Sequence, residues 1–187
     1  MQSDGKVLVG GSFSRIGSAG RTNLARFNAD GTLDDTYTPY VNGTVWSIAI
    51  DADNTAFVGG DFTTIGGQKR SRLAKLRLDQ DGAADAAWNP ATIPNGGVVS
   101  ALALDGAGRL YVGSSFLGDR PLRRLSTTGT GGFDPAWGPS SLIGNITSIS
   151  IAPEESVYAA GSFYQSGYGE RARMTGGAAH ERRARCP

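Results

Sequence analysis

Two adjacent glycines after an apolar run, Gly10 and Gly11, are the first residues of the sequence that could do chemistry. A glycine loop binds phosphate when it leads into a helix N-terminus with a Gly-x-Gly-x-x-Gly or Lys-Ser/Thr pattern. Neither context surrounds VGGSF at 9–13. The motif recurs as VGGDF at 58–62, VGSSF at 112–116 and AAGSF at 159–163. Such recurrence indicates architecture rather than a single catalytic site.

Aspartate-rich turns are the second candidate group. NADG at 28–31, DADN at 51–54 and DQDG at 79–82 are similar to the start of a calcium loop, but the further oxygen ligands and the final glutamate are absent. Asp and Asn also form turns unaided. No histidine lies within the repeats, because the only one is His180. We therefore predict no catalytic residue, no metal site and no cofactor.

The phenylalanines of the recurring motif define the period of the chain. Phe13, Phe62, Phe116 and Phe163 are separated by 49, 54 and 47 residues. A period of about 50 fits a four-stranded propeller blade. Because Ala160 and Ser114 also occupy the glycine positions, these positions require small size for close approach. The structural signature comprises Gly10, Gly11, Phe13, Gly59, Gly60, Phe62, Gly113, Phe116, Gly161 and Phe163.

Other segments repeat in step with this motif. VWSIAI, VSALAL and ITSISI, at 45–50, 99–104 and 146–151, alternate large aliphatic with small uncharged residues, which predicts an inner or middle strand. The segments beginning at Leu24, Leu73 and Leu122 carry a basic column, for which we predict a solvated face with local ion pairs. The members of this column are Arg26, Lys75 and Arg124.

These patterns predict an all-β fold of about three and a fraction four-stranded propeller blades in an incomplete ring. The expected boundaries are 1–43 for a first blade without its first strand, 44–97 for the second, 98–144 for a shortened third and 145–166 for the start of the fourth. Residues 167–187 leave the pattern. For them we weigh a disordered end and an out-of-frame sequence against a basic tail that binds an acidic partner.

Tyr37, Trp88 and Trp137 occupy equivalent places, each near a following proline. Buried aromatics at a fixed repeat position fill the space between blades, and this is the interpretation we favour. Exposed aromatics can instead stack on sugar rings, so these three are also candidate ligand contacts.

The sequence QSDGKVLVGGSFSRIGSAGRTNLARFNADGTLD resembles the delta-60 repeat family of β-propellers. The matching positions run from Asp-Gly-Lys through Gly-Gly-x-Phe to Leu-Ala-Arg-x-Asn-x-Asp-Gly, and the third repeat departs by a five-residue shortening between Phe116 and Leu122. The resemblance implies a propeller in a bacterial surface or secreted protein, hence an extracellular location, with no general catalytic activity. We expect no signal peptide within this chain.

Composition limits the partners. The net charge of +1 gives no general attraction to nucleic acid, and no apolar run approaches the ~18 residues of a membrane helix. The only cysteine, Cys186, excludes an internal disulfide framework. We predict a non-catalytic scaffold or a module that binds protein or carbohydrate, with self-association through open propeller edges. The alternatives are a fragment of a propeller hydrolase or lyase and a non-functional truncated gene fragment.

Overall fold

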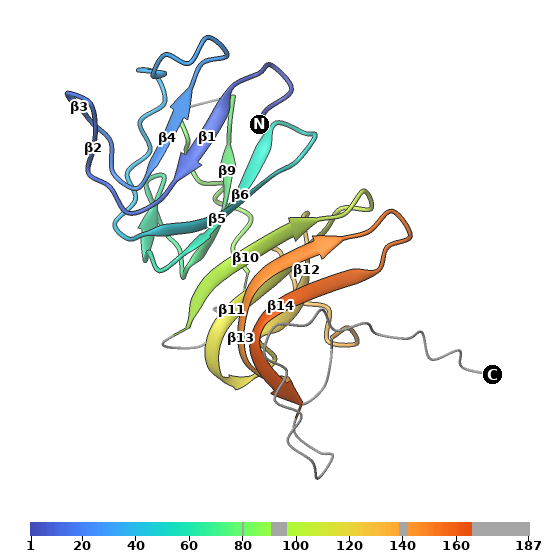
Figure 1. The fold of residues 1–187 in the computed structure, drawn as a ribbon. Coiled ribbons are helices and arrows are strands. Elements are labelled where there is room, and N and C mark those ends of the chain that lie inside the picture. Colours follow the sequence, from blue (N-terminus) through green and yellow to red (C-terminus); the bar gives the residue numbers. More distant parts are fainter. Residues whose placement is uncertain (80, 91–96, 139–141, 166–187) are drawn as a thin grey trace.

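The computed structural model describes residues 1–79, 81–90, 97–138 and 142–165. Every regular element in this part is a strand, and every strand pair is antiparallel (Figure 1). The strands are β1 (Val7–Gly10), β2 (Arg15–Ile16), β3 (Ala19–Gly20), β4 (Leu24–Phe27), β5 (Val45–Ile50), β6 (Thr55–Gly60), β7 (Thr64–Ile65), β8 (Gln68–Lys69), β9 (Leu73–Arg77), β10 (Val98–Leu104), β11 (Arg109–Asp119), β12 (Leu122–Ser126), β13 (Leu142–Ile151) and β14 (Val157–Gln165). The predicted all-β fold class is confirmed. The described residues contain no helix long and apolar enough to cross a membrane.

The repeating unit is a second strand that lies between an inner strand and a third strand. β6 pairs with β5 on one side and β9 on the other, and β11 pairs with β10 and β12 in the same way. Asp-containing turns such as 51–54 join inner to second strands, because Asp side chains cap the turn backbone. The alternating segments predicted as inner or middle strands thus form the inner strands β5, β10 and β13.

All three inner strands pair with their second strands in one register. A bulge interrupts the pairing at the equivalent position each time, between Val45 and Ser47, between Val99 and Ala101, and between Ile146 and Ser148. The inner strands also lie beside one another, since β10 contacts both β5 and β13. The repeats therefore follow one another along a curved arc, with inner strands adjacent (Figure 1).

The predicted fourth strand of each repeat is much shorter in the structure than expected. It is reduced to one antiparallel bridge, at Leu33, Ala84 and Phe133. An aspartate follows each bridge and accepts a hydrogen bond from the backbone N–H two residues later, as Asp34 does from Thr36. This turn ends the extended segment, because it redirects the chain away from the sheet.

The third and fourth repeats share one sheet. Between second and third strands, the first two repeats insert a short hairpin, β2–β3 or β7–β8, whereas the shortened third repeat has none. β11 instead continues to Asp119, and its second half pairs with β13. β13 begins at Leu142, before the expected blade boundary at 145.

The apolar core lies between repeats rather than inside each one. In the first cluster, Leu24 and Tyr37 of the first repeat pack with Ala56 and Val58 of the second. The second cluster joins the second and third repeats, and the third joins the third and fourth. A single repeat consequently cannot bury its own apolar surface, so stability depends on stacking of neighbours.

Candidate binding surface

The first glycine of each pair lies directly against the inner strand of the next repeat. A Cβ atom added at these positions would stand 2.3, 2.3 and 2.5 Å from a methyl group of the neighbouring strand, for Gly10 with Val45, Gly59 with Val99 and Gly113 with Ile146. None of the three glycines has a positive φ. The positions therefore require small size and close approach, and they form no phosphate loop.

The remaining signature residues have less uniform surroundings. A Cβ at Gly60 would meet the Thr44 carbonyl oxygen at 2.1 Å, whereas one at Gly11 would only touch the Phe13 ring. Phe62 is buried in the first cluster, while Phe13 and Phe163 are half-buried. The side chain of Phe116 lies outside the described residues. Gly161 sits against the Asn145 carbonyl, at 2.1 Å from an added Cβ.

The aromatic column lies between repeats for its first two members. Tyr37 and Trp88 are fully buried, and each ring lies over a glycine of the next repeat, Gly82 and Gly131 respectively. Trp88 Nε1 also donates a hydrogen bond to the Ser126 carbonyl at 3.1 Å. A ligand cannot reach rings buried in this way, so the structure does not support the candidate ligand-contact role for these two.

Trp137, the third member of the column, is half-buried. Its ring meets that of Tyr111 edge-on, with centroids 5.0 Å apart. The Arg124 guanidinium lies 5.2 Å from the centre of the same indole and pairs with Asp134. Trp137 is thus held by its own repeat and is the only one of the three that keeps a partly open ring.

The predicted solvated face of the basic column is wrong for two of its three members. Arg26 and Lys75 are only 6% and 8% exposed. Arg26 Nη1 donates to the Leu78 carbonyl at 2.6 Å, and Lys75 Nζ lies 3.3 Å from the Thr127 carbonyl. Each cation therefore binds the main chain of the following repeat, and the sequence pattern could not show this because the acceptor lies 52 residues away.

An aromatic ring of the same repeat completes each cation site. Arg26 Cζ lies 4.2 Å from the centre of the Tyr37 ring, and Lys75 Nζ lies 5.4 Å from that of Phe57. The aliphatic stems pack as apolar groups while the charged heads meet a π face and a carbonyl oxygen. Burial raises the pKa of the Tyr37 hydroxyl, whose oxygen has no hydrogen-bond partner among the described residues.

Asp34 is a buried carboxylate with several hydrogen-bond donors around it. It accepts hydrogen bonds from Thr36 Oγ1 at 2.7 Å, Lys6 Nζ at 2.9 Å and Arg26 Nε at 2.9 Å. The Thr36 hydroxyl, followed by Lys6 and Arg26, holds the pKa of Asp34 well below its usual range despite burial. The side chain therefore remains ionised near neutrality, so it is unsuited to donate a proton as a general acid.

The aspartates of the turns bind backbone and threonine groups instead of gathering around a common centre. Asp30 accepts from the N–H and hydroxyl of Thr32, and Asp53 does the same with Thr55. Across the described ranges, no three His, Cys, Asp or Glu side chains are grouped so that they could hold a metal ion. His180 and Cys186 lie outside the described residues.

Two large aromatic side chains remain exposed at the hairpin end of the repeats. Tyr40 is 60% and Trp46 59% exposed. The connection that carries Tyr40 is fixed on the β7–β8 hairpin, because Gly66 N donates to the Tyr40 carbonyl at 3.1 Å and Asn42 Nδ2 to Thr63 Oγ1 at 2.8 Å. Trp46, the second residue of β5, lies at the same end, since neighbouring Val45 pairs with Gly60 just before the hairpin.

Sequence reasoning missed both residues because it searched for features that recur. Ser100 and Thr147 occupy the position of Trp46 in the next two inner strands. A large aromatic in a column of small polar residues was the available signal.

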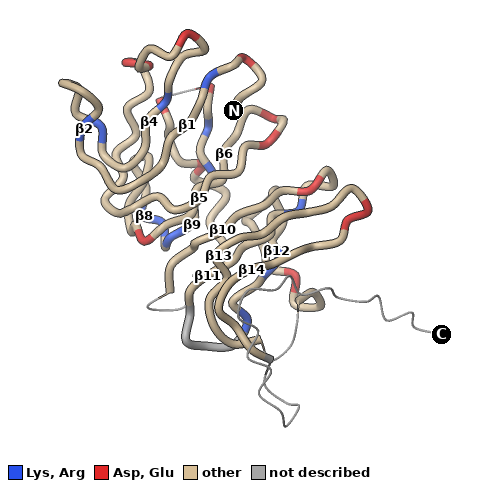
Figure 2. The backbone as a smooth tube through the Cα atoms, in the orientation of Figure 1, with Lys and Arg blue, Asp and Glu red and all other residues tan. Residues whose placement is uncertain are grey.

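Acidic side chains lie at both ends of the repeats, since Asp61 stands beside Gly43 at the hairpin end. Acidic side chains gather at the turns between inner and second strands, around Asp53, Asp105 and Glu154 (Figure 2). These turns lie at the far end of the inner strands from Trp46, because Ile50, at the other end of β5, pairs with Ala56. The hairpin end therefore presents Tyr40 and Trp46 away from the acidic turns, and it is the candidate binding surface.

Comparison with known proteins agrees with the repeated antiparallel strand architecture described above. Residues 2–37 and 52–87 match a family described as a β-propeller domain of unknown function, DUF5122. The two matched segments fall in the first two repeats, and each carries one copy of the glycine-pair motif. The resemblance to a propeller repeat family is thereby confirmed, and no curated protein matches the chain.

Solved structures show the same fold at low identity. The extracellular domain of a one-component system from B. thetaiotaomicron is 16% identical over 90% of this chain, with a TM-score of 0.54. A protein of unknown function from Bacteroides caccae is 14% identical over 84% of the chain, with a TM-score of 0.52. The chain spans 20% and 50% of the lengths of these two structures, so it corresponds to only part of each.

Proposed function

We propose that this chain is a non-catalytic β-propeller segment that serves an extracellular or cell-surface protein as a scaffold or binding module. Its partner is a protein or a carbohydrate, bound at the hairpin end. The observation that carries the proposal is the exposure of Tyr40, on a connection held by the β7–β8 hairpin, and of Trp46, on the adjoining strand β5. Exposed aromatic rings on a fixed loop offer large contact area at low entropic cost.

The positions of the charged groups support a non-catalytic role. Asp34 is occupied by Lys6, Arg26 and its own turn. Arg124 and Asp134 pair with each other. Groups that are paired in this way stabilise the turns and strands of their own repeats, whereas a catalytic carboxylate would need a free face toward substrate.

The extracellular location is supported by two similarities. The repeat resembles a family found in bacterial surface proteins, which supports an extracellular location. The similar structure from B. thetaiotaomicron is described as the extracellular domain of a one-component system. Proteins that share a fold at this level of identity can differ in function, so the cellular location of this chain has to be measured directly. Fractionation of the native host, with detection of the chain on intact cells, provides it.

The binding proposal is tested with purified chain on a glycan array and in pull-downs against surface proteins, alongside a panel of glycoside hydrolase and lyase substrates. Tyr40→Ala and Trp46→Ala are expected to weaken binding about tenfold or more. Tyr164→Ala is the matched control, because Tyr164 is similarly exposed, at 56%, but lies on β14. Binding that survives both variants, or turnover of any substrate in the panel, would contradict the proposal.

A further inference from the structure

We propose that the hairpin end binds an acidic polysaccharide, with a sugar ring stacked on Tyr40 and acidic groups of the polymer paired with cations of successive repeats. The inference rests on the function proposed above and names the class of carbohydrate. The cations that carry it are Arg15, Lys69 and Arg120.

Tyr40 and Lys69 lie on one outward face of the second repeat. Val41 forms an antiparallel bridge with Ile65 of β7, and both side chains are fully buried. Because successive residues of an extended chain point to opposite faces, Tyr40 and Thr64 point away from the core. Thr64 pairs with Lys69 of β8, and paired residues share a face of the sheet. An exposed ring and an exposed ammonium group therefore border the same outward surface.

This surface belongs to an interior repeat and is fixed by hydrogen bonds. Core clusters join the second repeat to both the first and the third, so the exposure of Tyr40 and Lys69 does not arise at an end of the arc. Asn42 Oδ1 accepts hydrogen bonds from the N–H groups of Thr63 and Thr64, both at 2.8 Å, which ties the connection to the hairpin. A ring held in this way loses little conformational entropy when a ligand stacks on it.

Each of the first three repeats presents an exposed cation at this end. Arg15 of β2 occupies the place of Thr64 in β7, so the basic residue lies on the opposite strand of the hairpin from Lys69. In the shortened third repeat, Arg120 lies between β11 and β12, where the first two repeats carry their hairpins. Among the described residues, no carboxylate forms an ion pair with any of these three cations. Their charges are therefore available to an acidic ligand.

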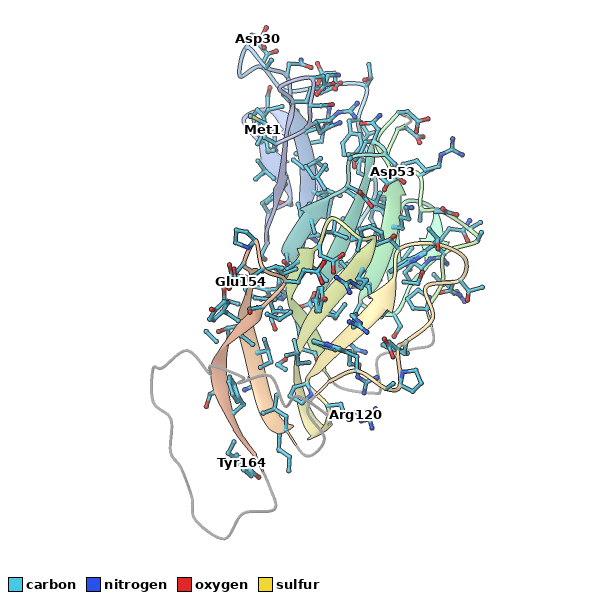
Figure 3. All side chains as sticks on the ribbon, turned by 90° about the vertical axis from the view of Figure 1, so that its right-hand side faces the viewer. Met1, Asp30, Asp53, Arg120, Glu154 and Tyr164 are labelled. Atoms are coloured by element: carbon cyan, nitrogen blue, oxygen red, sulfur yellow. The ribbon has the colours of Figure 1, made fainter. Side chains whose placement is uncertain are left out.

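Carboxylates near the hairpins are few, and their positions leave these cations free. Figure 2 shows basic residues on both hairpins. Asp35 is paired with Arg21, and the exposed Asp61 lies beside Gly43, before the β7–β8 hairpin begins. In the last two repeats, Glu154 and Tyr164 mark opposite ends of the β13–β14 pair, and Arg120 lies toward the Tyr164 end (Figure 3). Cations spaced by one repeat are complementary to a polymer that carries regularly spaced negative charges.

The exposed ring favours an acidic sugar over an acidic peptide as the occupant. A pyranose presents a flat apolar C–H face that can pack on the Tyr40 ring, while its carboxylate or sulfate group reaches the Lys69 ammonium. An acidic peptide would use the cations but would not require the ring. Dependence on both the ring and the charge is therefore the signature of this site.

The test measures binding of the full chain to two matched pairs of polymers by biolayer interferometry. The pairs are polygalacturonate with its methyl ester, and dextran sulfate with dextran. We expect saturable binding of at least one acidic polymer, with its neutral counterpart at least about tenfold weaker, and binding that weakens as salt screens the charges. Poly-L-glutamate supplies charge without a sugar and should also bind at least about tenfold more weakly.

Variants of the protein locate the site. Tyr40→Ala should weaken binding of the acidic polymer about tenfold, whereas Tyr40→Phe keeps the ring and should stay within about twofold of the unaltered chain. Lys69→Gln should weaken binding about two- to fivefold, because it removes an exposed ionic contact. Arg77→Gln is the matched control, since it removes a cation beside the turn at 51–54 and should leave binding unchanged.

The outcomes separate this inference from the function on which it rests. Equal binding of an acidic polymer and its neutral counterpart, equal binding of poly-L-glutamate, or equal affinities of Lys69→Gln and Arg77→Gln would overturn the acidic polysaccharide. Binding of none of the polymers would overturn it as well. The hairpin-end proposal would still stand in these cases if a protein or neutral glycan bound and Tyr40→Ala weakened that binding. Binding that survives both Tyr40→Ala and Trp46→Ala would overturn both.

Discussion

Three glycines at one turn position separate backbone strain from packing between repeats. Gly31, Gly82 and Gly131 share a positive φ, of 83°, 90° and 77°. Replacement by alanine at any of them carries the left-handed conformational penalty of about 1 kcal/mol. Their surroundings differ, because an added Cβ at Gly31 meets nothing within 4 Å. Gly31→Ala is therefore expected to cost about 1 kcal/mol of unfolding free energy.

The other two glycines lie under rings of the preceding repeat. An added Cβ at Gly131 would stand 2.7 Å from Trp88 Cε2, and one at Gly82 would stand 3.0 Å from the Tyr37 ring. Trp88 cannot yield easily, since its Nε1 is bonded to Ser126 and its ring meets Phe57 edge-on. Overpacking of this kind adds about 1–3 kcal/mol to the cost of strain. Gly82→Ala and Gly131→Ala should therefore each lower the free energy of unfolding by about 2–4 kcal/mol.

Urea denaturation followed by tryptophan fluorescence measures these differences. Each kcal/mol corresponds to roughly 2–4 °C in midpoint for a chain of this length, so thermal unfolding gives a second readout. Trp88→Phe in the Gly131→Ala background should recover part of the loss, because the smaller ring leaves room for the methyl group. Equal losses at Gly31 and Gly131 would refute the reasoning, since strain alone would then account for both.

Three further predictions concern the Asp34 ion pairs and the close approach at Gly59. Arg26→Leu should cost about 3 kcal/mol of unfolding free energy in denaturant titration, because it leaves Asp34 buried with fewer partners, whereas Arg77→Leu at an exposed pair should cost under about 0.5 kcal/mol. Because the pKa of Asp34 is lowered in the folded state, ionisation of this carboxyl stabilises the fold at pH values above its unfolded-state pKa of about 3.9. This contribution is lost as the pH falls below that value. Asp34→Asn should therefore flatten the stability profile below about pH 4, and an unaltered acid limb would contradict this assignment. Gly59→Ala should destabilise by about 1–3 kcal/mol through contact with the next repeat, while Gly106→Ala, where an added Cβ meets nothing, should be near neutral in the same assay.

The sequence by itself determined the repeat, its period and the strands that compose it. Inner strands could be recognised from alternation of large and small uncharged residues, because a strand covered on both faces tolerates no charge. The glycine pair could be interpreted as a requirement for small size, because alanine and serine replace it in other repeats. These inferences need only local periodicity and comparison of one repeat with another.

Only the tertiary structure decided what each repeated residue contacts. Arg26 and Lys75 lie on equivalent strands that were expected to have a solvated face. Each side chain instead donates a hydrogen bond to a carbonyl group 52 residues further along the chain. Aromatic residues do not recur at the positions equivalent to Tyr40 and Trp46, so comparison of the repeats did not identify these two. Long-range contacts between repeats determine burial, and a period in the sequence does not contain them.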